Sequence, residues 1–388
     1  MATNGDPLAF SAQAPKQIYQ QLREHVREMI VQGALPAGAK LPSTKELATK
    51  WSVPAATVQA ALTHLVKEGL LIRIRKKGTF VLDRNRRLER VGVYYDTSVW
   101  LPETNSFKRA IHVELLKLCE SKGLKLEAFF DSRKPALRTT PLGDVLQAVE
   151  SRQIQALIAT DVAVDEATWI GKLPIPTAVF VEAQHPTKVD LDFEQFIALG
   201  LEKLKEAGCR SVGIISLRGP WKPSLGTEEV GKLPSFTETF SKLCREHDIL
   251  TSDHWIRTAE AFVEGKAPQE EFGYSQFIQI WNRALRPDGL IVYPNSCSVG
   301  VITGVLEKRV DIPRQLKLVL HKHREIDYLC PIPVTFLYSS TSAIANALLQ
   351  QIVRQFRGES ISKVIIPFAS ESESRPDRRD VIATGVSQ

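Results

Sequence analysis

Near the amino terminus, cationic and hydroxyl side chains are spaced in a way that suits contact with a polyanion. Residues 1–90 contain 15 Lys and Arg against 7 Asp and Glu, whereas the remaining 298 residues contain 35 basic and 37 acidic side chains. Lysine neutralises backbone phosphates, glutamine can pair with an adenine edge, and alanine suits a thymine methyl group. The residues that we expect to contact DNA are Ser43, Lys45, Ala55, Thr57, Gln59, Lys76, Lys77 and Gly78.

Amphipathic helices would hold these side chains in position. Apolar residues recur at helical spacing from Ile18 to Ile30, and Gly33 stands where that helix would end. Ser43 and Glu46 have the spacing of a capping box, which predicts the start of a second helix. The polar segment before Ile18 is expected to be a flexible arm.

A third helix and a basic hairpin would complete this unit. Pro54 is tolerated in a first helical turn because its missing N–H would have no partner there, and Gly69 would end the helix. The apolar inner face would consist of Val58, Ala61, Leu62, Leu65 and Val66. Two strands, 70–75 and 79–82, would be joined by the cationic tip 76–78. The pattern predicts a winged helix-turn-helix; the alternative is a plain three-helix domain whose charges form a solvated face.

The same stretch resembles the GntR-type winged-helix family over about 65 residues. The stretches that carry the resemblance are Ile18–Leu22, Gly33–Ser43, Glu46–Ala48, Thr57–Val58, Glu68–Leu70 and Gly78–Val81. The resemblance implies a DNA-binding regulator in which the third helix reads the DNA. It also implies a homodimer that places two winged helices on a pseudo-palindromic operator.

The departures from the family pattern lie on the side that would face DNA. The family usually has Arg where Lys45 stands, Ser-Arg where Pro54 and Ala55 stand, and Arg-Arg where Gln59 and Ala60 stand. Because arginine is the usual partner of guanine and glutamine pairs with adenine, we hypothesise a half-site that leans towards A·T pairs. Phosphate contacts by Lys45, Thr57, Lys76 and Lys77 would supply most of the affinity.

From Val91 onward, short apolar strands alternate with amphipathic helices. The predicted strands are 91–95, 124–130, 156–159, 177–181, 211–215, 289–293 and 316–320. The predicted helices include 111–118, 145–149, 196–204, 236–244, 274–285 and 299–306. Such alternation is typical of doubly wound parallel sheets in an α/β fold, with ligands at the carboxyl ends of the strands.

Residues 91–370 resemble the effector domain of the lactose/galactose repressor family, which is similar to periplasmic sugar-binding proteins. The stretches that carry this resemblance, in order, are 91–93, 156–159, 174–179, 189–192, 204–213, 287–291, 310–313, 331–335 and 364–367. The resemblance implies a periplasmic-binding-protein-like body of two lobes, crossed by three strands near residues 186–190, 322–326 and 354–360. A small ligand would lie in the cleft between the lobes.

The residues expected to contact an effector follow strand ends or begin helices: Tyr95, Asp96, Asp161, Arg218, Lys232, Asn295 and His321. By the resemblance, Lys232 stands where the family has a ligand-clamping Arg, and Asn295 where it has a sugar-binding Asp. His321 stands where the family has an acidic segment. This less acidic cleft would favour an effector carrying a carboxylate or phosphate. Alternatively, Asp161 would cap a helix and Asn295 would stabilise a turn.

Other classes of site find little support in the sequence. The five cysteines are widely spaced without a Cys-x-x-Cys, so we expect neither disulfides nor a zinc site. His321 and His323 have no third ligand at suitable spacing and are expected to be exposed or interface residues. No metal or cofactor is therefore expected. The chain also has neither an apolar signal segment nor a membrane-length apolar run, so we expect a soluble cytoplasmic protein.

The sequence as a whole predicts a ligand-responsive transcriptional regulator, a repressor that a small carbohydrate-related effector releases from its operator. One alternative is an aminotransferase-like body that uses pyridoxal phosphate, but the body is short and lacks a suitable lysine context. Hydrolase and phosphate-loop motifs are also absent from the sequence, so no enzyme is expected. A second alternative is a DNA-binding regulator whose body has lost ligand binding and serves dimerisation or partner recruitment. The expected divisions are an arm (1–15), a winged helix (16–82), a linker (83–90), an effector and dimerisation domain (91–370) and a tail (371–388).

Overall fold

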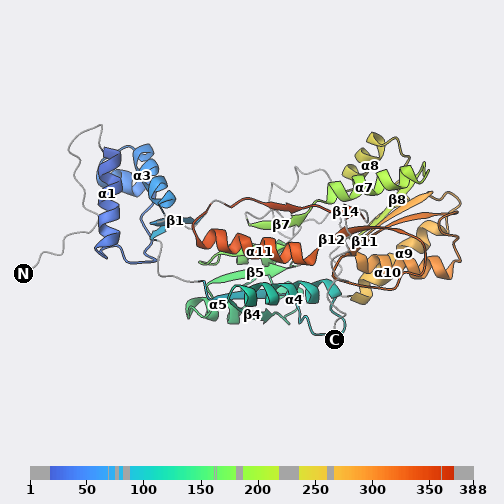
Figure 1. The fold of residues 1–388 in the computed structure, drawn as a ribbon, viewed down its shortest axis with the longest axis horizontal. Helices are drawn as coiled ribbons and strands as arrows, with labels where there is room; N and C mark the ends of the chain where they lie inside the picture. Colours follow the sequence, from blue (N-terminus) through green and yellow to red (C-terminus); the bar gives the residue numbers. More distant parts are fainter. Residues whose placement is uncertain are drawn as a thin grey trace, which may run out of the picture.

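The amino-terminal helices and hairpin form a small head, residues 18–81, at one end of the molecule (Figure 1). A computed structural model describes residues 18–68, 70–74, 78–81, 88–160, 162, 164–180, 187–217, 236–259, 266–359 and 361–370. Within these residues the head consists of α1 (Ile18–Val31), α2 (Thr44–Trp51), α3 (Ala55–Lys67), β1 (Leu71–Ile74) and β2 (Gly78–Val81). The strands pair antiparallel, so the predicted winged helix-turn-helix is confirmed.

Local signals set the helix ends of the head. Ser43 Oγ accepts a hydrogen bond from Glu46 N (3.2 Å), and Ser43 N donates one to Glu46 Oε2 (2.7 Å), which confirms the capping box. Gly33 follows α1 with a φ of +77°, a conformation that favours glycine. Pro54 lies at the N-cap, one residue before α3, because its ψ of 138° is extended. The prediction of Pro54 inside the first turn was therefore wrong by one position, and Gly69 lies outside the described residues.

A single apolar core holds the head together. The predicted inner face of α3 is buried, with Val58 and Leu65 fully inaccessible and Val66 partly buried. Side chains of α1 and α2 pack against it, among them Leu22 and Leu47. Burying an aliphatic side chain contributes roughly 2 kcal/mol. The core therefore fixes the orientation of α3 against α2.

The body divides into two lobes, each with a twisted sheet. Lobe 1 contains the described residues within 88–191 and 341–366, and its described sheet has the order β13-β7-β6-β5-β3-β4 with every pair parallel. Its strands are β3 (Arg90–Tyr95), β4 (Lys125–Phe130), β5 (Ala156–Thr160), β6 (Thr177–Phe180), β7 (Lys188–Leu191) and β13 (Val364–Ile366). Its helices are α4 (Ser106–Ser121), η1 (Pro135–Leu137), α5 (Gly143–Glu150), α6 (Val164–Ile170) and α11 (Thr341–Phe356).

Lobe 2 contains the described residues within 193–339 and 369–370. Its described sheet has the order β14-β12-β11-β10-β8-β9, in which only the short β14 is antiparallel. The strands are β8 (Val212–Ser216), β9 (Ile256–Thr258), β10 (Gly289–Tyr293), β11 (Lys317–His323), β12 (Thr335–Ser339) and β14 (Ala369–Ser370). The helices are α7 (Phe193–Glu206), α8 (Phe236–Glu246), α9 (Lys266–Trp281) and α10 (Asn295–Glu307). The predicted doubly wound parallel sheets are confirmed, and lobe 1 lies between the head and lobe 2 (Figure 1).

The chain crosses between the lobes at positions that differ from the prediction. It crosses between β7 and α7 (191–193), between β12 and α11 (339–341), and between β13 and β14 (366–369). The first crossing lies just after the expected 186–190, whereas the crossings expected near 322–326 and 354–360 were wrong. The reason is sheet membership: β11 pairs with both β10 and β12, so the chain stays in lobe 2 until β12 ends.

One apolar cluster extends across both lobes, and each lobe also has a cluster of its own. A cluster of buried side chains extends from Val91 in β3 through Phe196 in α7 to Leu337 in β12. Across the boundary, the Phe107 ring of α4 stacks on the His323 ring of β11 with centroids 4.9 Å apart. Among the described residues, none of the helices is long and apolar enough to cross a membrane.

Candidate nucleic-acid interface and effector domain

The exposed face of α3 carries a glutamine that the neighbouring helix holds in place. Thr44 Oγ1, in the first turn of α2, donates a hydrogen bond to Gln59 Oε1 (3.2 Å). An amide oxygen has a second lone pair, and the amide nitrogen has two donors. Gln59 therefore retains the groups that a bidentate contact with adenine requires. Its exposed neighbours on α3 are Ala55, Ala56 and Ala60.

The wing is tied to the same helix through a second hydroxyl. Thr63 Oγ1 donates to Gln59 O (2.7 Å), and Arg73 Nη1 of β1 donates to Thr63 Oγ1 (3.4 Å). Thr44, Gln59, Thr63 and Arg73 thus form a polar row from α2 across α3 to the wing. Sequence reasoning missed three of these residues, although the four-residue spacing of Gln59 and Thr63 places both on one helix face.

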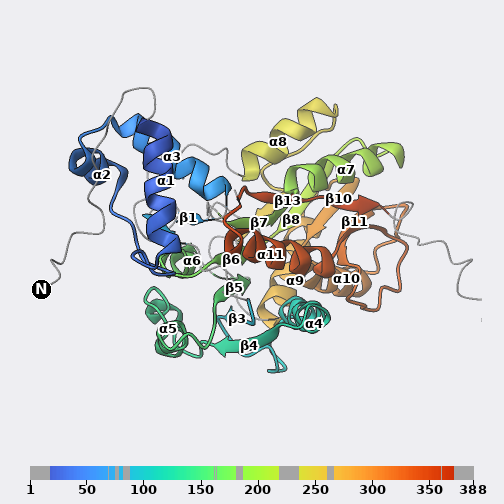
Figure 2. The same cartoon turned by 60° about the vertical axis from the view of Figure 1, so that its left-hand side comes forward.

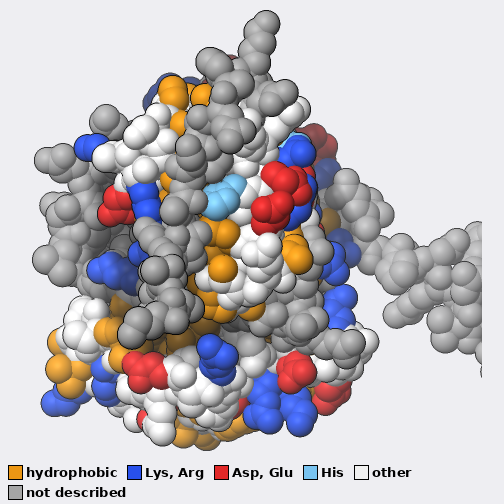
Figure 3. Space-filling view, turned by 90° about the vertical axis from the view of Figure 1, so that its left-hand side faces the viewer, with side chains coloured by type: hydrophobic (Ala, Val, Ile, Leu, Met, Phe, Trp, Pro, Cys, Tyr) orange, Lys and Arg blue, Asp and Glu red, His pale blue; other side chains and the backbone are white. Residues whose placement is uncertain are grey.

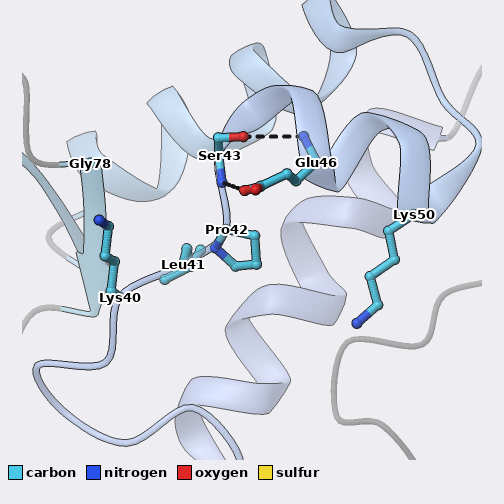
Figure 4. A pocket seen from close by; sticks show the side chains of 7 residues that line it. All are labelled: Lys40, Leu41, Pro42, Ser43, Glu46, Lys50 and Gly78. Atoms are coloured by element: carbon cyan, nitrogen blue, oxygen red, sulfur yellow. Dashed lines mark hydrogen bonds between the residues drawn. The ribbon is translucent and has the colours of Figure 1, made fainter.

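A hollow of about 750 Å³ lies between the wing and α2. It is lined by Lys40, Leu41, Pro42, Ser43, Glu46, Lys50 and Gly78, and the two lysines lie on opposite sides of it (Figure 4). The Lys40 side chain lies along Gly78, so that a Cβ built there would be 3.1 Å from Lys40 Cε. Gly78 has a φ of +119° and leaves room for this lysine. Lys40 and Lys50 were not among the predicted contacts.

The carboxylate inside this hollow is already engaged. The hydrogen bond from the Ser43 backbone lowers the pKa of Glu46, with further contributions from the Ser43 side chain and the Lys40 charge. Glu46 therefore stays ionised as the partner of the capping box. A phosphate near the hollow would meet Lys40 and Lys50, together with the amino-terminal turn of α2, whose peptide dipoles favour anions.

A charged cluster elsewhere on the head has a structural role. Arg27 of α1 donates to Glu68 Oε2 (2.5 Å), and His64 Nδ1 lies 2.9 Å from Glu68 Oε1. The Arg27 hydrogen bond is the main cause of the lowered pKa of Glu68. The cluster joins α1 to the end of α3. Viewed from the end that carries the head, the described cationic, anionic and apolar side chains are interspersed (Figure 3).

The predicted DNA-contacting residues within the described chain lie on α2, α3 and the wing. Ser43, Lys45, Ala55, Gln59 and Gly78 are exposed, whereas Thr57 is half-buried on α3. Lys76 and Lys77 lie outside the described residues. The structure places Ser43 and Gly78 in one hollow, with Gln59 held against the first turn of α2.

The lobe 1 residues expected to contact an effector are engaged internally. The Tyr95 ring is fully buried, stacks on Phe130 (5.8 Å) and has its hydroxyl 3.2 Å from His112 Nδ1. Asp96 is 1% exposed and pairs with Lys108, while Arg138 Nη1 lies 3.6 Å from Asp96 Oδ2. Both cations offset the cost of burying this carboxylate.

The lobe 2 candidates lie at the start of α10 and in β11. Asn295 is the first residue of α10 and is 8% exposed. His321 is fully buried, and its Nε2 lies 2.9 Å from Ser339 Oγ, which is also 2.8 Å from His323 Nδ1. Asp161, Arg218 and Lys232 lie outside the described residues.

Burial decides the charge state of the two histidines. It is the main cause that places the pKa of His321 well below its ordinary value and lowers the pKa of His323 to about 4. Both rings are therefore neutral near pH 7, which corrects the expectation that they would attract an anion. They are also buried at the lobe boundary instead of exposed. Within the described residues, no group of three potential ligands could hold a metal ion.

Comparison with known families agrees with this two-part architecture. The family model "Bacterial regulatory proteins, gntR family" matches residues 18–81, and the model "Periplasmic binding protein-like domain" matches residues 201–367. The fold and these matches define the class: the chain carries a GntR-type helix-turn-helix domain followed by a periplasmic-binding-protein-like domain.

The similarity to two curated proteins covers less than a fifth of this chain. The HTH-type transcriptional repressor NagR of Bacillus subtilis is 42% identical over 72 residues, which cover 19% of this chain and 30% of that protein. The mannosyl-D-glycerate transport/metabolism system repressor MngR of Escherichia coli is 38% identical over 66 residues, covering 17% and 28%. The chain thus spans about 30% of the length of such relatives.

Among solved structures, the similarity extends over more than two thirds of this chain. A regulatory protein of the LacI family from Chloroflexus aggregans aligns with a TM-score of 0.57 at 13% identity, covering 72% of this chain and 96% of that one. The lac repressor dimer bound to operator and an anti-inducer aligns with a TM-score of 0.56 at 13% identity, covering 74% and 93%. At this identity, the similarity shows the fold.

Proposed function

We propose that this protein is a ligand-responsive transcriptional regulator, a repressor that a small carbohydrate-related effector releases from its operator. The observation that carries the proposal is the exposed face of α3, on which Thr44 holds Gln59 beside the first turn of α2. The relatives NagR and MngR are both named repressors. In this proposal the protein is located in the cytoplasm, where it binds its operator and its effector and catalyses no reaction.

In this proposal α3 enters the major groove of double-stranded DNA. Gln59 reads an adenine edge, and Ala55 lies against a thymine methyl group, which gives a half-site leaning towards A·T pairs. Backbone phosphates are bound by Ser43, Lys45, Thr57, Lys76, Lys77 and Gly78. The hollow adds Lys40 to this set because its side chain lies between the wing and α2.

The body serves as an effector and dimerisation domain in the same proposal. Two copies place two heads on a pseudo-palindromic operator, and an effector between the lobes changes the relative positions of the heads. The proposed effector contacts are Tyr95, Asp96, Asp161, Arg218, Lys232, Asn295 and His321. Effector and operator then weaken each other's binding by one common factor, because coupling between two sites is reciprocal. The proposed divisions are 16–82 for the DNA-binding domain and 91–370 for the body.

Selection of DNA from a random library, followed by fluorescence anisotropy, tests the DNA-binding part. The full chain should enrich a pseudo-palindrome with A·T pairs opposite α3, and its affinity should fall steeply as salt rises. Enrichment of invariant G·C pairs at those positions would contradict the role of Gln59. If no sequence is enriched above random DNA, the proposed function itself fails.

A second candidate function is a DNA-binding regulator whose body serves only dimerisation or partner recruitment. The observation that favours it is the internal engagement of Tyr95, Asp96 and His321, each of which is buried with a partner from the same chain. A thermal-shift screen over sugars, sugar acids and sugar phosphates separates the two candidates. A ligand that raises the melting temperature and weakens operator binding supports the first; a screen without such a ligand supports the second.

A further inference from the structure

The turn that follows α11 lies against the wing of the head. A Cβ built on Gly358 would lie 3.7 Å from Ile72 Cγ1 and 3.8 Å from both Ile72 Cβ and Leu71 O. These distances are ordinary van der Waals contacts between the body and β1. Figure 1 shows β1 beside this end of α11. The view turned by 60° shows the same neighbourhood (Figure 2).

The contact uses the face of the wing that points away from α3. Successive side chains of a strand point to opposite faces. Leu71 is buried in the core of the head, and Arg73 touches Thr63 of α3, so both face the helices. Ile72 and its cross-strand neighbour Phe80 therefore lie on the outer face, where both are half-buried. Docking at this face leaves the polar row that includes Gln59 open.

The helix that presents the turn is firmly anchored in lobe 1. Ile344, Leu348 and Ile352 of α11 are fully buried, and the helix packs on α4 and on strands β5, β6 and β7. Near its carboxyl end, Gln355 Nε2 donates to Thr177 O (2.8 Å), while Thr177 N donates to Gln355 Oε1 (3.3 Å). The position of the turn is therefore fixed by the sheet of lobe 1.

The other end of α11 lies at a lobe crossing. Glu325 of lobe 2 accepts hydrogen bonds from Thr341 N (2.8 Å) and Ser342 N (3.2 Å), and so caps the helix from across the boundary. A helix of 16 residues is about 24 Å long. This one helix thus connects the lobe boundary, at Ser340, with the wing, at Gly358.

We propose that the turn 357–359 is a docking site for the outer face of the wing, and that it holds the head in one orientation with α3 exposed. The docked head is the form that binds DNA, a statement that rests on the proposed function. The contact between the turn and the wing does not depend on that function. Because α11 begins at the lobe boundary, docking also gives the head a rigid connection to the region where the lobes meet.

A disulfide across the contact tests the docking. The distance of 3.8 Å between the two Cβ positions lies within the range for disulfides. The test uses a Cys330→Ser background, in which all the remaining native thiols are buried. In this background the pair Ile72→Cys and Gly358→Cys should cross-link almost completely under mild oxidation. The matched control is Ile72→Cys with Gly123→Cys, since Gly123 has a similar φ (+67°) and open space around it. Equal rates for the two pairs would overturn the docking.

Hydrogen exchange supplies a test that needs no cysteine variant. Ile72→Asp should raise the exchange of the amides at 357–359 at least severalfold, because a charge on the outer face disrupts the contact. Arg73→Asp, on the opposite face of the same strand, should leave those amides unchanged. If the two variants affect the turn equally, the wing does not dock there.

DNA binding by the cross-linked protein then tests the orientation. The oxidised double variant, Ile72→Cys with Gly358→Cys, should bind selected DNA at least as tightly as its reduced form, because docking leaves α3 open. Loss of binding on oxidation, with recovery on reduction, would overturn the docked head as the DNA-binding form. If the reduced and unmodified proteins also fail to bind any DNA, the proposed function fails, whereas the cross-linking rates still decide the docking.

Discussion

Thr44 on α2 donates a hydrogen bond of 3.2 Å to Gln59 on α3, so the two helices jointly position the side chain proposed to read a base. Both residues lie on the surface of the head. Pre-organisation of this kind lowers the entropy lost when the side chain contacts DNA. Under the proposed function, this hydrogen bond links the helix-turn-helix geometry to base preference.

Gln59→Ala should weaken binding to the selected operator by about 1–3 kcal/mol and relax the preference for A·T pairs at one position per half-site. Thr44→Val, which keeps the shape but removes the donor, should cause a smaller loss in the same direction. Anisotropy titrations against operators with single base changes measure both effects. Unchanged discrimination in Gln59→Ala would contradict base reading by this residue.

Lys40→Gln should weaken binding to all DNA sequences alike and reduce the slope of log affinity against log salt by about 1, because one phosphate contact is lost. The Lys40 side chain lies beside Gly78 at the hollow and is not part of the exposed face of α3. Lys122→Gln, on the exposed end of α4, is the control and should leave the slope unchanged. A changed base preference in Lys40→Gln would argue against a phosphate contact.

Folding stability should fall as pH drops from about 6.5 towards 4, because His321 and His323 are buried in their neutral forms. Their pKa values are lower in the folded chain than in the unfolded chain, so the unfolded state takes up protons first. For His323, with a pKa of about 4, the loss is roughly 3 kcal/mol once the pH is below both values. Urea unfolding at several pH values measures it.

Two variants separate this effect from general acid sensitivity. His323→Phe keeps an aromatic ring against Phe107 and should flatten the pH dependence, although it loses the hydrogen bond with Ser339. His254→Gln, on an exposed turn, should leave the dependence as it is in the unmodified protein. A pH dependence that His323→Phe leaves unaltered would show that other groups cause it.

Glu325→Ala should lower the free energy of unfolding by about 1 kcal/mol, the typical loss when a helix cap is removed. Glu325 caps α11 through Thr341 N and Ser342 N, and it also accepts a hydrogen bond from Ser340 Oγ (2.6 Å). Burial raises its pKa, but these hydrogen bonds outweigh burial and the pKa is lowered overall. This contribution is therefore present above the ordinary carboxyl pKa and is lost as the pH falls through the folded value.

Asp327→Ala is the matched control for the capping residue. Asp327 lies two positions further along the chain and pairs with Lys322 at 2.8 Å, but its side chain is 94% exposed. Exposed ion pairs contribute little to stability because water screens them. Equal destabilisation by both variants would show that Glu325 contributes no more than a surface charge.

The head could be predicted almost completely from the sequence because its signals are local. The capping box of Ser43 and Glu46 spans four residues, and the helix of Ile18–Val31 shows its periodicity within a single window. The hairpin closes over a short connection. The sequence did not reveal the contacts between elements: Thr44 with Gln59, and Lys40 with Gly78.

In the body, the sequence predicted the fold class, whereas the tertiary structure decided where the chain crosses between the lobes. The alternation of apolar strands and helices determined the α/β class, because a buried strand shows its apolar pattern whichever strands pair with it. The lobe crossings depend instead on which sheet each strand joins, and pairing of β11 with β10 and β12 moved one crossing to 339–341. Such pairings join residues distant in sequence, so no local pattern specifies them.

For the candidate residues, the sequence predicted their positions in helices and strands, but their protonation states and contacts depend on tertiary packing. The sequence by itself placed His321 near the end of a strand and Gln59 on the outer face of a helix, since both follow from periodicity. Only the tertiary structure decided that His321 is neutral, because its pKa depends on burial among side chains from distant elements, among them the Phe196 and Phe368 rings. Likewise, only the tertiary structure showed that the body contacts the wing where Gly358 packs against Ile72.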